Sequence, residues 1–406
     1  MSTTERLYYN DSHLREFEAH VTGVIERAEG QKAVTLDRTA FYPTGGGQPS
    51  DTGTLDGARV VECIEEDERV LHVVEGSHWE VGARVLGQVD WPRRLDHLQQ
   101  HTGQHILSQA FVQLFNAETR SFRMMEQLSE IDVALEQPSD ERIAEAVSLA
   151  NSIIWEDREV RVRQVTKEES ARLPLRKDSE REGELRIIEI ENFDLSPCGG
   201  THAGRTGEVG IICVRSWERA KGLVRIEFVA GGRALADYNR ANRTARAVAA
   251  MFSTGRDESQ AAVARLMEEN KQLSRQVRSL EEVTAKVEAE ELWQEARELT
   301  GGRRLVRRIY EGRDADALKR VALGIVAHAQ TFALLGSRDG ETTRLVFARS
   351  VDAHGDMNAL VREACRLLDG RGGGKPDIAQ GGGRNPSKLE EALAAAAESI
   401  ETSTIN

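Results

Sequence analysis

The sequence predicts an α+β protein of several domains, and three observations support that fold class. The chain has 406 residues, more than one ordinary hydrophobic core organises. Short apolar runs separated by glycines fill residues 1–90, whereas helical patterns alternate with strand patterns from Trp91 onward. A proline-free helical segment and a second α/β alternation follow. We therefore expect four parts, with the limits 1–90, 91–245, 246–300 and 301–406.

The first part is predicted to be all β. Its apolar stretches VTGVI, KAVTLD, RVVECI, VLHVVEG and RVLGQVD have the spacing of strands in a small barrel or sandwich. Between the second and third of these stretches lies a glycine-rich segment, FYPTGGGQPSDTG, at residues 41–53.

The second part reads as an α/β or α+β unit. We expect helices at 97–115 and 139–155 and strands at 129–136, 158–164, 185–191, 208–216 and 223–230. The stretch SPCGGTHAGRTGEVG, which begins at residue 196, places a cysteine beside two glycines, and this pattern indicates a tight turn.

The segment 257–299 predicts a long helix or a short coiled coil. Leu266, Leu273, Leu280 and Val287 follow one another at seven-residue steps in a sequence rich in Glu, Arg, Gln and Ala. Three arrangements stay open: one amphipathic helix packed on its own chain, a helical hairpin, or the seam of a homodimer. In a seam, Asn270 would be a polar position that sets the register.

The last part is predicted to be α/β. Strands are expected at 303–310, 331–337 and 343–350, helices at 314–329 and 356–369, and a glycine-rich loop over 371–393 before a final helix. The stretch GGGKPDIAQGGG lacks the Gly-Lys-Ser/Thr ending of a Walker motif, so we do not expect nucleoside triphosphate binding.

Composition limits the partners and the location. The net charge of −13 gives no overall basic footprint, so any nucleic acid must be held by a local patch. The chain has no apolar run near the ~18 residues of a membrane span and no signal-peptide pattern, so we expect a cytoplasmic protein without a membrane partner. Its four cysteines show no disulfide framework, and three are expected in cores.

Four residues predict a metal site. His101 and His105 are four residues apart on a predicted helix and therefore share a face, as in many metal sites. Such a pair alone is also compatible with solvated or core histidines. Cys198 and His202 add a thiolate and an imidazole four residues apart. Three nitrogens and one sulfur suit tetrahedral Zn²⁺. Four protein ligands are typical of structural zinc, so the sequence leaves a catalytic role open.

The motifs resemble a known family. HTGQH at 101–105, CGGTH at 198–202 and the glycine-rich segment at 41–53 resemble the editing half of alanyl-tRNA synthetases and the stand-alone alanyl-tRNA editing proteins. The stretch at 372–383 resembles the C-terminal domain that these synthetases share with DHH-type phosphoesterases. The resemblance implies a β-barrel, a zinc-containing editing domain, a helical connector and a C-terminal domain that binds tRNA and often dimerises.

The resemblance also implies roles for single residues. Gln48 matches the family's glutamine, which would orient the amino acid or water, although it could instead stabilise its own turn. Thr119 matches the pocket threonine that senses the serine hydroxyl. For tRNA contact we expect Arg303 and Arg304 in a local basic stretch, which could also be a solvated edge strand. Two further cations flank the glycine-rich loop, Lys375 and Arg384.

The implied reaction is hydrolysis of the ester that joins serine or glycine to tRNA(Ala). Because the barrel begins near the first residue, we expect editing in trans and no aminoacylation. Two alternatives stay open: a zinc hydrolase of small aminoacyl esters, and a tRNA-binding module with structural zinc and no catalysis. The preference between serine and glycine is left open.

Overall fold

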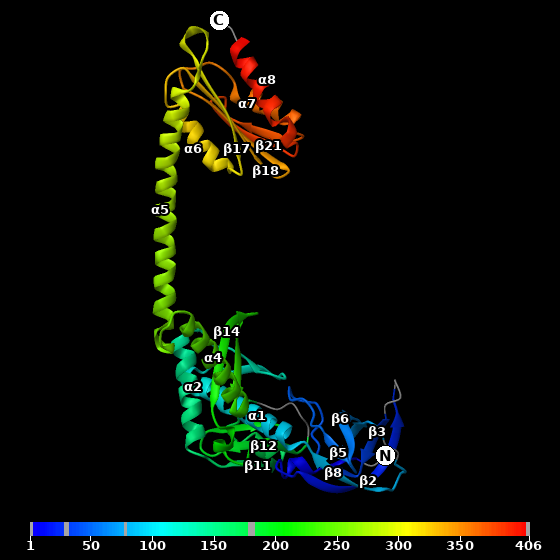
Figure 1. Ribbon diagram of the computed structural model, residues 1–406. Coiled ribbons are helices and arrows are strands. Elements are labelled where there is room, and N and C mark those ends of the chain that lie inside the picture. The colour runs from blue at the N-terminus through cyan, green and yellow to red at the C-terminus, as the bar shows by residue number, and fades with distance from the viewer. Residues whose placement is uncertain (1–2, 28–31, 77–78, 178–182, 403–406) are drawn as a thin grey trace. The chain divides into compact units, whose positions relative to one another are not determined.

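The computed structural model describes residues 3–27, 32–76, 79–177 and 183–402, which form a mixed α/β chain with two compact units (Figure 1). One unit comprises residues 1–248 and the other residues 249–406. The finer limits at 90 and 300, inside these units, remain predictions. No helix within the described ranges combines the length and the apolar character that a membrane crossing requires.

Six strands of the first unit close into a barrel in the order β2-β3-β7-β6-β5-β8. In β2, Phe17, Ala19 and Val21 are buried while the residues between them are exposed, as expected for a strand with one face on a core. Strands β1 and β4 form a separate, short parallel pair. The bounds are β1 Glu5–Arg6, β2 Glu16–Glu26, β3 Lys32–Leu36, β4 Arg38–Thr39, β5 Gly53–Leu55, β6 Ala58–Glu66, β7 Arg69–Val74 and β8 Arg84–Val89.

The rest of the first unit contains two antiparallel sheets, with the orders β14-β15-β10-β9 and β11-β12-β13. Helices α1 and α2 pack on the four-stranded sheet, and α1 contributes Ile106, Leu107 and Phe111 to the shared core. The sequence did not predict α4. The bounds are α1 Trp91–Phe115, β9 Thr119–Met124, β10 Ser129–Val133, α2 Asp140–Trp155, β11 Val160–Val165, α3 Lys167–Ser170, β12 Leu185–Ile190, β13 Asp194–Pro197, β14 Ile212–Ala220, β15 Leu223–Ala230 and α4 Gly231–Met251.

Helix α1 begins at Trp91, earlier than the predicted residue 97. The side chain of Asp90 accepts a hydrogen bond from the backbone N–H of Arg93, and Pro92 occupies the first turn. An acidic N-cap followed by proline is a favourable helix start, because the cap satisfies a free N–H and proline has none to satisfy. The extra turn adds Arg94 to the helix.

Arg94 connects α1 to the glycine-rich segment through a fully buried ion pair. Arg94 and Asp51 both have no exposed surface, and the Arg94 Nε lies 3.1 Å from both carboxylate oxygens. The guanidinium also donates to the carbonyls of Ser12 and Ala40, at 2.7 and 2.6 Å, and Asp51 accepts from the backbone N–H of Tyr42 at 2.7 Å. These contacts satisfy two buried charges and hold the glycine-rich segment against α1.

The second unit contains a six-stranded sheet with the order β16-β17-β18-β19-β21-β20. One face packs against α7 and α8, and the other against α6 and the last turns of α5. The bounds are α5 Ser259–Gln294, β16 Arg297–Glu298, β17 Arg304–Glu311, α6 Ala315–Ile325, β18 Thr331–Asp339, β19 Thr342–Arg349, α7 Met357–Leu367, β20 Arg371–Gly374, β21 Ile378–Gly383 and α8 Leu389–Thr402.

The prediction of a glycine-rich loop over residues 371–393 is wrong. Its first half is the β20–β21 hairpin, and α8 begins at Leu389. The glycines permit close packing: a Cβ on Gly381 would lie 2.5 Å from the Sγ of Cys365 and 2.7 Å from the Cα of Gly372. The backbone groups of this segment therefore pair with neighbouring strands instead of forming a loop.

The predicted long helix is present as α5. Its heptad residues are exposed within the chain: Leu266 by 51%, Leu273 by 59%, Leu280 by 67% and Val287 by 56%. Within the described residues of the second unit, the stripe is therefore left unpacked, and pairing with a second copy remains a prediction.

Candidate metal centre and active site

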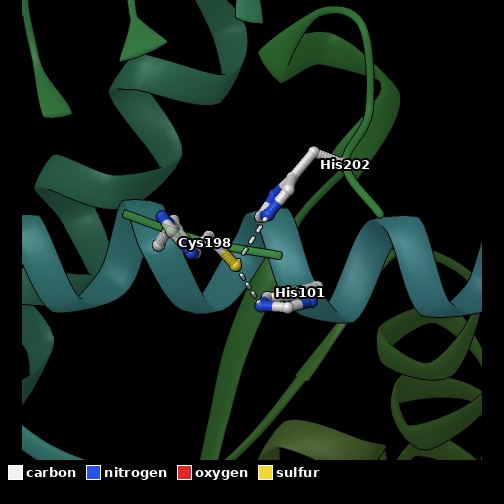
Figure 2. Close-up of side chains that lie close together, drawn as sticks. His101, Cys198 and His202 are labelled. Atoms are coloured by element: carbon white, nitrogen blue, oxygen red, sulfur yellow. Dashed lines mark hydrogen bonds between the residues drawn. The ribbon is translucent and has the colours of Figure 1, made fainter. Parts of the chain in front are cut away.

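The four predicted ligands converge. The candidate ligand atoms of His101, His105, Cys198 and His202 all lie within 4.8 Å of one another. The Cys198 Sγ is 3.4 Å from the Nε2 of His101 and 3.3 Å from the Nε2 of His202. Figure 2 shows both imidazoles pointing toward the sulfur. The two helical histidines come from α1, and the other pair comes from the turn that follows β13.

Each imidazole is oriented by a hydrogen bond at its other nitrogen. The Nδ1 of His101 lies 2.7 Å from the Oε1 of Gln48, and the Nδ1 of His105 lies 3.1 Å from the Oδ2 of Asp194. The Nδ1 of His202 lies 3.3 Å from the Oγ1 of Thr102. The amide oxygen of Gln48 and the carboxylate of Asp194 can only accept at Nδ1, so they favour the tautomer that leaves Nε2 free as a ligand, and metal-binding histidines usually have such partners.

The ligand turn requires glycine and is held by Arg186. A Cβ on Gly200 would lie 2.1 Å from the Cε1 of His101, so no larger residue fits while the ring keeps its place. The Nη1 of Arg186 donates to the carbonyls of Cys198 and Gly200, each at 2.8 Å, and its own carbonyl accepts from the N–H of Cys198 at 3.0 Å. These contacts explain the glycines beside the cysteine.

The electrostatics favour an ionised donor set. Burial opposes ionisation of Cys198, but its electrostatic interactions with the imidazoles of His101 and His202, together with hydrogen bonds from His101 and His105, outweigh burial and lower the pKa of the thiol well below its ordinary value. Burial lowers the pKa of His202 to about 3. Burial likewise opposes ionisation of Asp194, but the adjacent Arg176 and His105 keep the pKa of this carboxyl below its ordinary value. A thiolate with neutral imidazoles suits Zn²⁺.

Asp194 is a positioning residue that sequence reasoning missed. Besides His105, it contacts the Nε of Arg176 at 2.8 Å and the Oγ of Ser196. It lies four residues before Cys198, but nothing in the local sequence links it to a histidine in α1. The contact arises only when β13 packs against that helix.

We predict that Asp194→Asn weakens zinc binding by about 10- to 100-fold. The amide can present its N–H to His105 and leaves the charge of Arg176 unpaired, so the Nε2 ligand is less well oriented. Competition with a chromophoric chelator would measure the affinity. Asp132→Asn on β10, which disrupts an ion pair with Arg225, is the matched control. Equal affinities for both variants would contradict the assigned role.

A cavity of about 540 Å³ adjoins the cluster. His101, His105 and Cys198 form part of its wall, together with Gln104 and Thr119. Basic side chains line it as well, namely Arg120, Arg176, Lys177 and Arg186. A basic, enclosed volume beside a potential metal site can receive the end of a polyanionic substrate.

The structure revises the role predicted for Gln48. This side chain is 1% exposed and lies behind His101, not on the cavity wall. Its Nε2 donates to the Oγ1 of Thr201 at 2.8 Å, while its Oε1 contacts His101. With both ends of the amide engaged, Gln48 is held against His101, and a contact with the amino acid or water remains a prediction.

Thr119, which matches the family's pocket threonine, lies on the cavity wall. Its Oγ1 donates to the Oγ of Ser108 at 2.7 Å, and the Nε2 of Gln104 donates to the same oxygen at 2.8 Å. Ser108 has no exposed surface and was not predicted. The three side chains form a polar network at one side of the cavity.

The four predicted tRNA contacts lie in the second unit and have different environments. Arg303 is 6% exposed and donates to the carbonyls of Thr300 and Ile400, and contact with RNA remains a prediction for it. The guanidinium carbon of Arg304 lies 4.5 Å from the ring centre of Trp293. The other two, Lys375 and Arg384, are exposed at the ends of β20 and β21.

The fold and the cluster define a class of protein with a strand-rich N-terminal domain and a buried His₃Cys set. Three family models match the chain: "tRNA synthetases class II (A)" over residues 2–93, "Threonyl and Alanyl tRNA synthetase second additional domain" over 185–227, and "DHHA1 domain" over 301–402.

Known proteins match over most of the length. The alanyl-tRNA editing protein AlaX-L of Pyrococcus horikoshii is 33% identical over 98% of this chain and 98% of its own. The chain therefore belongs to the AlaX-L family of alanyl-tRNA editing proteins.

Larger relatives match only in part. The alanine-tRNA ligase of Pyrobaculum calidifontis is 33% identical over 96% of this chain, and that of Natronomonas pharaonis is 34% identical over 98%. The chain spans 44% of the length of each ligase. The C-Ala domain of Aquifex aeolicus alanyl-tRNA synthetase is 25% identical over 26% of this chain and 97% of its own, with a TM-score of 0.25.

Proposed function

We propose that this protein is an aminoacyl-tRNA deacylase that acts in trans and removes serine or glycine from mischarged tRNA(Ala). The observation that carries the proposal is the largely buried His₃Cys cluster, three members of which lie on the wall of a basic cavity. End-to-end similarity to a protein named for alanyl-tRNA editing supports the same reaction. Three ligand histidines with outer hydrogen bonds fit a metal-assisted or metal-stabilised site.

The residues present fit zinc. His101, His105, Cys198 and His202 would hold the ion, and the lowered thiol pKa matches what a zinc ligand requires. When bound, zinc could polarise the ester carbonyl, lower the pKa of a water molecule, or grip the end of the tRNA. Gln48, Asp194 and Thr102 would keep the imidazoles in the ligating tautomer, as their contacts to Nδ1 indicate.

Thr119 and Ser108 would recognise the serine hydroxyl. Their hydroxyl groups form a hydrogen-bonded pair beside the cavity, and a serine hydroxyl would extend this pair by one hydrogen bond. An alanine methyl group in the same place would leave the pair without that partner, which favours serine over alanine. Glycine would enter because it is small.

The second unit would bind the tRNA body. Arg304, Lys375 and Arg384 would contact the phosphate backbone, whereas Arg303 would support the fold. Exposed cations on a sheet can position RNA without reading its sequence, so recognition of tRNA(Ala) itself would need further contacts.

The direct test is release of labelled serine from Ser-tRNA(Ala), compared with Gly-tRNA(Ala) and Ala-tRNA(Ala). We expect rapid release of serine or glycine and little release of alanine. Free seryl esters tested in parallel would identify a small-ester hydrolase if they were cleaved equally well. No release by the folded, zinc-loaded protein would favour a tRNA-binding module with structural zinc.

Thr119→Val should slow serine release by about 10- to 100-fold and change glycine release by only a few fold. Valine keeps the shape of threonine but removes the hydroxyl, so one hydrogen bond to serine is lost and glycine loses nothing. The measurement is kcat/KM on both substrates. Equal losses would show that Thr119 shapes the cavity instead of sensing serine.

A further inference from the structure

Gln104 is a buried polar residue whose hydrogen bonds are incomplete. It lies on α1 between His101 and His105, is 6% exposed, and lines the same cavity as both histidines. Its Nε2 donates to the Oγ of Ser108 at 2.8 Å. Among the described residues, nothing forms a hydrogen bond with its Oε1.

The unpaired oxygen belongs to a residue of the cavity wall. The Oε1 of Gln104 is unpaired but is not fully enclosed by protein. In this it differs from the enclosed, unpaired side-chain atoms of Arg69, His97 and a few other described residues. Gln104 also belongs to the cavity wall, so a substrate in the cavity would lie next to this side chain. Ser108, which also accepts a hydrogen bond from Thr119, keeps the amide in this position.

We infer that the Oε1 of Gln104 binds the α-ammonium group of the amino acid that is to be removed. This inference rests on the proposed function and assigns a substrate contact within that site. An aminoacyl ester offers an ester carbonyl, which only accepts hydrogen bonds, and an ammonium group, which only donates them. An amide oxygen therefore pairs with the ammonium group and not with the carbonyl.

The charge of the cavity makes this acceptor important. Glu184 is the single carboxylate residue among the described residues of the wall, and it is exposed. The basic side chains that attract tRNA repel an ammonium group. A neutral amide oxygen can bind that group without forming an ion pair with the surrounding cations, and a hydrogen bond to a charged donor is stronger than a neutral one.

The inference explains how the site can hold glycine, which has no side chain. The ammonium group is common to serine and glycine, so loss of Gln104 should affect both substrates equally. Loss of the Thr119 hydroxyl should affect serine alone. The two positions are therefore distinguishable by experiment although they contact the same Ser108 oxygen.

The test compares Ser-tRNA(Ala) with 3-hydroxypropionyl-tRNA(Ala), which keeps the hydroxyl and lacks the ammonium group. The quantity compared is kcat/KM for Ser-tRNA(Ala) divided by kcat/KM for 3-hydroxypropionyl-tRNA(Ala). We expect Gln104→Met to lower this ratio by about 10- to 100-fold relative to wild type. Gln104→Glu keeps an acceptor and should preserve or raise the ratio. Gln113→Met, an exposed position on the same helix, is the matched control and should leave the ratio unchanged.

Three results would overturn the inference. The ratio in Gln104→Met could equal that of wild type, which would mean that Gln104 only supports Ser108. Gln104→Glu could behave like Gln104→Met, which would mean that the amide N–H₂ faces the substrate. The third result comes from calorimetric binding of a 3′-serylamide of adenosine, with and without its amino group, to the zinc-loaded wild-type protein. Equal affinities for the two analogues would mean that the site makes no contact with the ammonium group.

The calorimetric comparison does not depend on turnover, and wild-type protein should bind the analogue that has the amino group at least about 10-fold more tightly. If wild type releases no serine from Ser-tRNA(Ala), the proposed function fails and the inference fails with it. If wild type releases serine but Gln104→Met slows both acylated tRNAs equally, only the inference fails.

Discussion

Cys198→Ala is expected to lose tightly bound zinc and to slow release of serine from Ser-tRNA(Ala) by at least about 100-fold. The variant removes the one anionic ligand of the His₃Cys set and leaves three imidazoles around a smaller side chain. Loss of an outer hydrogen bond alone typically costs about 10- to 100-fold in affinity or activity, so loss of a ligand should cost more. Metal content after dialysis and single-turnover deacylation would measure the two effects.

Cys213→Ala is the matched control for this experiment. Cys213 is also only partly buried, but it lies on β14 outside the cluster, so the same substitution should leave zinc content and deacylation unchanged. Retention of tightly bound zinc by Cys198→Ala would contradict the metal-centre assignment. Loss of zinc with retained deacylation would assign the ion to stability alone.

The ligand set could be predicted because it consists of two local pairs. His101 with His105 and Cys198 with His202 each have a spacing that brings side chains together on one helix or one turn, whatever the rest of the fold does. Joining the two pairs needed only the expectation that they share one domain. The cluster of ligand atoms within 4.8 Å agrees with that expectation.

The outer residues could not be predicted in the same way. Asp194 and His105 are 89 positions apart and meet only after packing. Gln48 was found through its glycine-rich motif, but the motif did not reveal that its amide would face His101 and Thr201. Gln104 lies inside the HTGQH motif itself, and only its hydrogen bond to Ser108 shows which end of its amide is engaged.

The second unit shows two further limits of sequence reasoning. A run of glycines predicts a loop when only backbone freedom is considered, yet at Gly372 and Gly381 the lack of a side chain permits close packing within a hairpin. The basic stretch 303–308 predicts an exposed patch. In the structure, however, its residues have different surroundings. Arg303 precedes β17 and is buried with its guanidinium on the carbonyls of Thr300 and Ile400, while Arg307 and Arg308 are exposed.

Arg94→Met is expected to lower the free energy of unfolding by about 3–5 kcal/mol, because it leaves the carboxylate of Asp51 buried without its counter-ion. Both side chains have no exposed surface, and the guanidinium also satisfies the carbonyls of Ser12 and Ala40. Urea unfolding followed by circular dichroism and tryptophan fluorescence would measure the change. Arg161→Met removes an exposed ion pair with Glu159 and, as the matched control, should leave the free energy of unfolding almost unchanged.

This ion pair should also influence the metal centre. Asp51 lies three residues after Gln48 in the glycine-rich segment, so loosening that segment from α1 should misplace the amide that orients His101. We therefore expect weaker zinc binding in Arg94→Met under conditions where the protein is still folded. Unchanged stability would show that water replaces the guanidinium at Asp51, whereas reduced stability with unchanged zinc affinity would show that the barrel holds Gln48 without this contact.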